Sequence, residues 1–102
     1  FEILAKRDEN PLLSSEAQYR IGEIHLRQQK WDEALKAFKI IRDHYSELPD
    51  WYQLALLNMG ECYERLDNTE DAVKTYHSLV TLNPNNEYGR TAAKRLERLK
   101  DK

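Results

Sequence analysis

One spacing of residues occurs twice in this chain and constrains its fold more than any other feature. Each copy has a glycine, an alanine twelve residues later and an aromatic residue sixteen residues later. The copies, 38 residues apart, are Gly22, Ala34 and Phe38 in the first and Gly60, Ala72 and Tyr76 in the second. A shift of this size lies in the range of helical solenoid repeats, which stack one supersecondary unit on the next.

Composition favours helices. The chain has 102 residues, 40% hydrophobic and 33% charged, with only three glycines and three prolines. No segment alternates with a period of two, so we predict no strand. The fold class is therefore all-α, an antiparallel helix-hairpin solenoid. The formal net charge of −2 gives no overall field that would favour nucleic acid or an anionic membrane. No apolar run approaches the ~20 residues of a membrane span.

Turn signals divide the chain into one domain with two full repeats. Residues 1–7, with Phe1, Leu4 and Ala5 on one face, are predicted to be the tail of a preceding helix. Repeat 1 is predicted at 14–45, capped by Ser14 or by Ser15 in a capping box with Gln18. Repeat 2 is predicted at 51–82, and a capping helix at 87–100. Because the chain opens in a helix-like segment, we interpret it as part of a longer protein.

The repeated residues explain how two helices of a hairpin approach closely. A mid-helix glycine costs up to about 1 kcal/mol relative to alanine, so its recurrence indicates tight packing. The pattern resembles the tetratricopeptide repeat, a superhelix of helix hairpins. Repeat 2 carries the resemblance at Leu56, Met59, Gly60, Tyr63, Ala72, Tyr76 and Pro84, and repeat 1 at Ile21, Gly22, Ala34 and Phe38. Repeat 1 departs from the pattern at Gln18 and His25 and has four extra residues around Tyr45–Pro49.

The resemblance implies a binding groove, because such arrays present the first helix of each hairpin on a concave face. The groove residues it implies are Glu16, Tyr19, Glu23, Leu26 and Arg27 in repeat 1, Leu54, Leu57, Glu61, Glu64 and Arg65 in repeat 2, and Tyr88, Thr91, Arg95 and Arg98 in the last helix. An alternative is that Glu23–Arg27 and Glu61–Arg65 are only i,i+4 pairs on an exposed helix. Tyr19 and Leu57 are the preferred contacts, because apolar groups outside a core mark binding surfaces.

The charges of this groove do not match the basic clamp with which some family members hold C-terminal carboxylates. Glu23 and Glu61 stand one residue after the glycines, where that clamp needs an amide or a base. A partner carrying basic groups fits better, and we state this as a hypothesis.

A basic cluster occupies the last predicted helix, while residues 1–89 are acidic overall. The cluster comprises Arg90, Lys94, Arg95 and Arg98, followed by Lys100. It is either a site for an acidic or phosphorylated partner or a solvated cap that complements the helix dipole. Lys94 stands 34 residues after Gly60, where a further repeat would have its small residue, so we expect the hairpin pattern to end there.

No pattern predicts catalysis, a metal or a cofactor. His25, His44 and His77 have no ligand-like spacing, and the single Cys62 is interpreted as a buried apolar residue. We therefore expect a module that binds a protein or peptide, and no enzyme. The alternative is a structural segment that forms a homo-oligomer through its open end. The Gly-Glu pair after an apolar residue and the slightly long period resemble the repeats of bacterial envelope proteins. Examples are the coordinator of the Tol–Pal system and the outer-membrane assembly lipoprotein. The compartment stays open between periplasm and cytoplasm, with the resemblance favouring periplasm.

Overall fold

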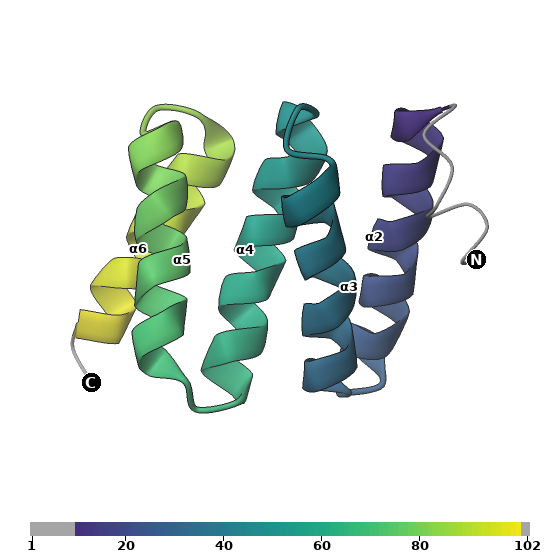
Figure 1. Ribbon diagram of the computed structural model, residues 1–102. Helices are drawn as coiled ribbons and strands as arrows, with labels where there is room; N and C mark the ends of the chain where they lie inside the picture. Colours follow the sequence, from purple (N-terminus) through teal and green to yellow (C-terminus); the bar gives the residue numbers. More distant parts are fainter. Residues whose placement is uncertain (1–9, 101–102) are drawn as a thin grey trace.

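The computed structural model describes residues 10–100, which form a row of antiparallel α-helices (Figure 1). The helices are α2 (Pro11–Arg27), α3 (Trp31–His44), α4 (Pro49–Arg65), α5 (Thr69–Leu82) and α6 (Glu87–Lys100). No strand occurs in this part of the chain, so the all-α hairpin fold is confirmed. The predicted helix at 1–7 lies outside the described residues.

Both hairpins begin earlier than predicted, each at a proline. Pro11 and Pro49 are the first residues of α2 and α4, where the missing N–H costs no hydrogen bond. Asn10 caps α2 by accepting a hydrogen bond from the Leu13 N–H at 3.2 Å. The predicted capping box is therefore wrong: Ser15 is buried within the helix, and its hydroxyl donates to the Leu12 carbonyl.

The two hairpin turns are built identically, 38 residues apart. Gln29 and Asp67 adopt the left-handed conformation, with φ of 61° and 60°. After them, the Lys30 N–H donates to the His25 carbonyl and the Asn68 N–H to the Tyr63 carbonyl, both at 2.8 Å. Each first helix thus ends in a Schellman-type turn. Asn68 also caps α5 by accepting a hydrogen bond from the Asp71 N–H.

The core runs through the whole row and contains the repeated residues. Ala34, Phe38, Ala72 and Tyr76 are fully buried. A Cβ atom added to Gly22 would lie 2.7 Å from the Phe38 ring, and one added to Gly60 would lie 2.3 Å from the Tyr76 ring. The repeated spacing therefore reflects a contact in which each glycine packs closely on the aromatic residue of the same hairpin.

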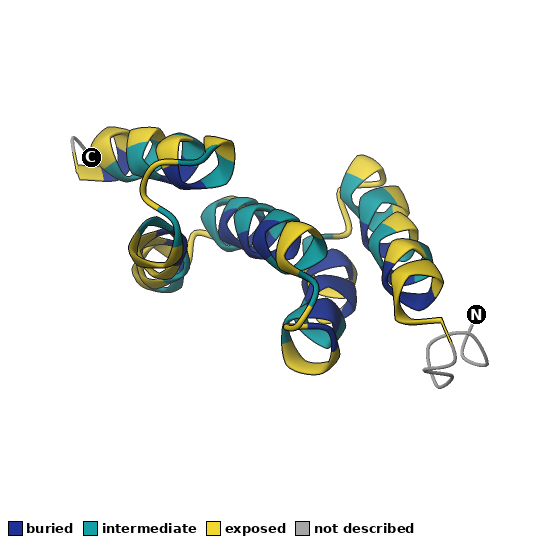
Figure 2. Cartoon of the chain, turned by 90° about the horizontal axis from the view of Figure 1, so that it is seen from above, coloured by how far each residue is buried: buried dark blue, intermediate teal, exposed yellow. Residues whose placement is uncertain are grey.

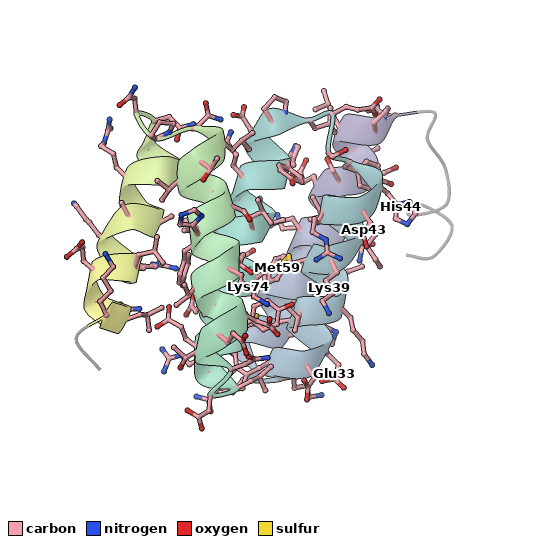
Figure 3. The ribbon with its side chains drawn as sticks, turned by 60° about the vertical axis from the view of Figure 1, so that its left-hand side comes forward. Glu33, Lys39, Asp43, His44, Met59 and Lys74 are labelled. Atoms are coloured by element: carbon pink, nitrogen blue, oxygen red, sulfur yellow. The ribbon has the colours of Figure 1, made fainter. Side chains whose placement is uncertain are left out.

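Two apolar residues of the helices are exposed. Ile24 is 51% exposed and Val73 37% exposed. Ile24 lies on the side of α2 that no described helix covers, whereas Val73 lies on α5 among charged neighbours. Figure 3 shows the α3 and α5 side, where Glu33, Lys39, Asp43 and Lys74 project from the two helices and Met59 of α4 is enclosed between them.

Candidate functional site: the inner face of the solenoid

The first helices of the hairpins and the last helix line one face of the molecule. Seen from above, α2, α4 and α6 form one row, and α3 and α5 form the other (Figure 2). Neighbouring helices of the first row contact each other, whereas α3 and α5, as far as the chain is described, do not. The row of α2, α4 and α6 is thus the inner side of the curve, as the predicted groove requires.

The N-terminal halves of these three helices make an apolar region. Tyr19, Leu57 and Tyr88 are half-buried and pack against the core. Leu54 is half-buried too, but it does not belong to the apolar groups that pack against the core. Leu54 is consequently a partly exposed apolar side chain of α4 that a partner could contact.

Tyr19 is less accessible than its sequence position implied. Its ring centroid lies 5.6 Å from those of both Phe38 and Trp51. Its hydroxyl accepts a hydrogen bond from the Asn58 amide at 3.4 Å. Tyr19 therefore joins the two hairpins, and its truncation would disturb the fold as well as the face.

The C-terminal halves of α2 and α4 carry loose ion pairs. Arg27 lies 3.6 Å from Glu23, and Arg65 lies 4.0 Å from Glu61. Both arginines are well exposed, and exposed pairs of this kind contribute little to stability. The i,i+4 alternative is thus present in the structure. Glu61 remains open to a competing cation, whereas Glu23 is also held by Arg20 at 3.0 Å. Of the other implied groove residues, Leu26 packs on the core, Glu16 is exposed and pairs with Arg20, and Thr91 is half-buried.

A hollow of about 320 Å³ opens between α4 and α6. It is lined by Glu61, Glu64, Arg65, Arg95 and Arg98. Glu61, Glu64 and Arg65 are implied groove residues of repeat 2, and Arg95 and Arg98 belong both to the implied groove and to the basic cluster. The structure brings the residues of both helices to one place, at the C-terminal end of the inner face.

Glu64 is the centre of the hollow. One of its carboxylate oxygens accepts the Tyr76 hydroxyl and the other accepts the Arg98 guanidinium, each at 2.5 Å. Arg95 donates to the Tyr76 hydroxyl at 3.3 Å and lies over its ring. Burial and the hydrogen bond to Glu64 raise the pKa of Tyr76. Among the described residues no carboxylate pairs with Arg95, so the hollow keeps one uncompensated guanidinium.

The basic cluster is therefore not a single site. Arg95 and Arg98 face the hollow, whereas Arg90 donates to the Asn85 carbonyl beside its own helix N-terminus. Lys94 is exposed, while Gly89, Ala92 and Leu99 are the buried residues of α6. Counting 34 residues from Gly60 thus does not identify the packed position of this helix.

A polar network that the sequence analysis did not identify holds α6 in place. Buried Gln53 accepts hydrogen bonds from the side-chain amides of Asn83 and Asn86 at 3.0 and 2.7 Å. The Asn86 side chain in turn accepts from the Gly89 N–H at 2.9 Å. The only signal in the sequence was the Asn-Pro-Asn-Asn run, which predicted the turn but not its partner in α4.

Replacing Glu64 with leucine is expected to destabilise the fold by about 1–3 kcal/mol, because the buried Tyr76 hydroxyl loses its acceptor. Adding Tyr76→Phe should restore most of that loss. The double variant recreates the Leu26 and Phe38 pair found at the same positions of repeat 1. Arg98→Ala, at an exposed site, should cost much less. Urea unfolding measures all three, and a double variant no more stable than Glu64→Leu would contradict the assigned role.

Cys62 offers a probe of the core. Burial first, and then the charges of Glu61 and Asp32, raise the pKa of this fully buried thiol to about 12. Since the thiolate is the reactive form, Cys62 should resist an aromatic disulfide reagent at pH 8 in the folded protein and react promptly in urea. Rapid labelling of the folded chain at unchanged helicity would show that the interior opens locally.

The described residues contain no group of three His, Cys, Asp or Glu side chains that could hold a metal ion. Within the same residues, no helix is long and apolar enough to cross a membrane. The half-buried His25 has a buried Nδ1 without a hydrogen-bond partner, at the position where the resemblance places a tyrosine.

The sequence matches the tetratricopeptide repeat family over residues 13–98. The chain belongs to this family, whose repeats generally mediate protein–protein interaction. Comparison with curated proteins and with solved structures found no match.

Proposed function

We propose that the inner face of α2, α4 and α6 binds a segment of a partner protein, as a scaffold module within a larger protein. The observation that supports this best is the pairing of two unlike surfaces on one face. Half-exposed Leu54 lies in the apolar region, and the charged hollow lies about two to three turns further along α4. Such a face suits a peptide or helix with both apolar and charged side chains.

The charges of this face select among partners. Arg65 is loosely held by Glu61, and Arg27 is loosely held by Glu23, whose tighter partner is Arg20 at 3.0 Å, so a lysine or arginine of the partner could replace Arg65 or Arg27. Near α6 the charge of the inner face becomes positive, because Arg95 has no carboxylate partner among the described residues. The partner segment would therefore carry a basic group over α2 and α4 and an acceptor, such as a backbone carbonyl or a carboxylate, near α6.

The test uses peptides selected on the immobilised wild-type chain from a random display library. Their affinity is then measured for Leu54→Lys, which changes the inner face, and for Leu82→Lys, a half-exposed leucine on α5. We expect a loss of at least about tenfold for Leu54→Lys only, since one apolar contact contributes about 1–3 kcal/mol. Equal losses in the two variants, or none in either, would place binding elsewhere.

Charge reversal of Glu23 and Glu61 tests the electrostatic part separately. Selected peptides with lysine or arginine should bind the Glu23→Lys, Glu61→Lys variant more weakly, with a reduced dependence on salt. Unchanged affinity would remove the two glutamates from the proposal while leaving the apolar region in it. Because the repeats resemble those of bacterial envelope proteins, we also propose the bacterial periplasm as the compartment in which the partner is bound.

A further inference from the structure

Two arginines of the hollow lie over aromatic rings. The guanidinium carbon of Arg65 in α4 is 5.5 Å from the centre of the Trp31 ring, and that of Arg95 in α6 is 5.8 Å from the centre of the Tyr76 ring. Both side chains line the same hollow, one from each of the two helices. Because a guanidinium held on a ring has less freedom to lose, its edge N–H groups are prepared for an acceptor.

These two guanidinium groups also have no close acidic partner. Arg65 lies 4.0 Å from Glu61, and Arg95 pairs with no carboxylate in the part of the chain that the structure describes. Arg98 differs, because it donates to Glu64, whose other carboxylate oxygen accepts the Tyr76 hydroxyl. Arg98 and Glu64 therefore neutralise each other, and the cations available to a ligand are Arg65 and Arg95.

The number of available charges distinguishes between possible acceptors. Glu61 is the remaining acidic group of the hollow, and the proposed function pairs it with a lysine or arginine of the partner. The hollow then presents two uncompensated positive charges, of which a carboxylate would neutralise only one. A phosphoryl group carries a charge of about −1.5 to −2 at pH 7 and has three strong acceptor oxygens. It matches both the charge and the forked donors of two arginines.

We propose that the hollow binds a phosphorylated serine, threonine or tyrosine side chain of the partner segment, close to a lysine or arginine that pairs with Glu61. This inference rests on the proposed function and specifies the acceptor near α6. The volume of about 320 Å³ is at the lower end of the range of ligand pockets, about 300–1,000 Å³, so it suits one modified side chain. The net charge of −2 favours a protein partner over nucleic acid.

Phenyl phosphate tests the hollow without a peptide. It is titrated into the full 102-residue chain while a ¹H–¹⁵N spectrum is recorded. Saturable shifts are expected at residues 61–65 and 95–98. Phenyl phosphate should bind at least about tenfold more tightly than benzoate or phenyl sulfate, which carry one charge. Equal binding of benzoate would identify a carboxylate site and overturn the proposal, as would shifts that do not saturate.

Arg95→Gln and Arg90→Gln form a matched pair, because they remove the same charge from the same helix. Arg90 donates to the Asn85 carbonyl and does not line the hollow. Arg95→Gln should weaken phenyl phosphate binding at least about tenfold, and Arg90→Gln less than about twofold. Arg65→Gln, at an exposed position where the fold should be undisturbed, should also cause a large loss. Equal losses for the matched pair would reduce the effect to general charge, contrary to the proposal.

Glu61→Gln separates the two parts of the recognition. It should strengthen the binding of phenyl phosphate, because a negative charge beside Arg65 is removed. It should weaken the binding of a phosphorylated peptide that contains lysine, because the lysine loses its acceptor. Weaker binding of phenyl phosphate to this variant would contradict the assigned role of Arg65.

The peptides selected on the wild-type chain distinguish this inference from the proposed function. Phosphoserine is placed at each of their positions in turn, and one position should gain at least about tenfold in affinity, with the gain absent in Arg95→Gln. If the peptides bind through Leu54 but no position gains, the phosphate inference is wrong and the proposed function stands. If no peptide is selected at all, the proposed function fails first. An oligonucleotide that binds the hollow more tightly than the best phosphopeptide would overturn the inference in favour of nucleic acid.

Discussion

Gly89→Ala is expected to be among the most destabilising single changes in this chain, costing about 3 kcal/mol and detaching α6 from the rest of the solenoid. A Cβ atom at this position would lie 1.7 Å from the Asn83 carbonyl oxygen and 2.7 Å from its carbon. Both atoms belong to the backbone, so no side-chain rotation can relieve the overlap. The Asn83 side chain is itself held by Gln53, and Pro84 follows it directly. The helix must therefore move instead.

Urea unfolding measures the loss, and amide hydrogen exchange locates it. Exchange should accelerate throughout α6 more than in α2 and α3, because α6 contacts only α4 and α5 among the described helices. Lys94→Ala, at an exposed position of the same helix, is the control and should change stability by less than about 0.5 kcal/mol. Helix propensity alone gives the opposite result, a gain of up to about 1 kcal/mol for Gly89→Ala. A stabilised variant would mean that α6 is not seated as described.

The same variant connects the fold with the proposed function. Arg95 and Arg98 reach the hollow only because α6 is fixed at its N-terminus by Gly89 and Asn86. If α6 moves away, Glu64 loses Arg98 and the hollow loses one wall. Peptides whose acceptor group contacts Arg95 should then bind more weakly, while those held by Leu54 and Glu61 should lose less affinity.

Repetition explains why most of the fold could be predicted from the sequence. A position that recurs after 38 residues must meet the same neighbour in both hairpins, so the recurrence of Gly22 and Gly60 predicted close helix packing there. Only the structure shows that each glycine packs on the aromatic ring of its own hairpin. The helix starts were harder. Both repeats were predicted to begin after a proline, at 14 and 51, although Pro11 and Pro49 are the first helical residues. Sequence alone does not separate these two uses of proline, since both follow a non-helical residue.

The hollow could not be predicted because it arises where the two repeats differ. Repeat 1 has Leu26 and Phe38 where repeat 2 has Glu64 and Tyr76. The paired change from two apolar residues to an acceptor and a hydroxyl indicates contact, but the third member, Arg98, comes from α6. That helix does not follow the 38-residue register. The resemblance therefore implied Arg95 and Arg98 as groove residues, but no repeated position indicated which acceptor they would meet.

Gly60→Ala and Gly22→Ala are chemically the same substitution, yet the change in repeat 2 is expected to cost more. We expect about 3 kcal/mol for Gly60→Ala and about 1–2 kcal/mol for Gly22→Ala. The added Cβ would lie 2.3 Å from the nearest Tyr76 ring atom but 2.7 Å from the nearest Phe38 ring atom. The Tyr76 ring is also fixed at its hydroxyl by Glu64 and Arg95, whereas Phe38 can tilt against Tyr19.

Urea unfolding of both variants measures this difference, and a second substitution tests its cause. Tyr76→Leu removes the ring that the new methyl group meets, so Gly60→Ala should cost far less in a Tyr76→Leu background than in the wild type. A coupling above about 1 kcal/mol between the two sites is expected for residues in direct contact. If the two costs simply add, glycine is needed at position 60 for the backbone and not to leave space for the Tyr76 ring. Equal costs at Gly22 and Gly60 would show that the anchored hydroxyl does not limit how far the aromatic residue can move.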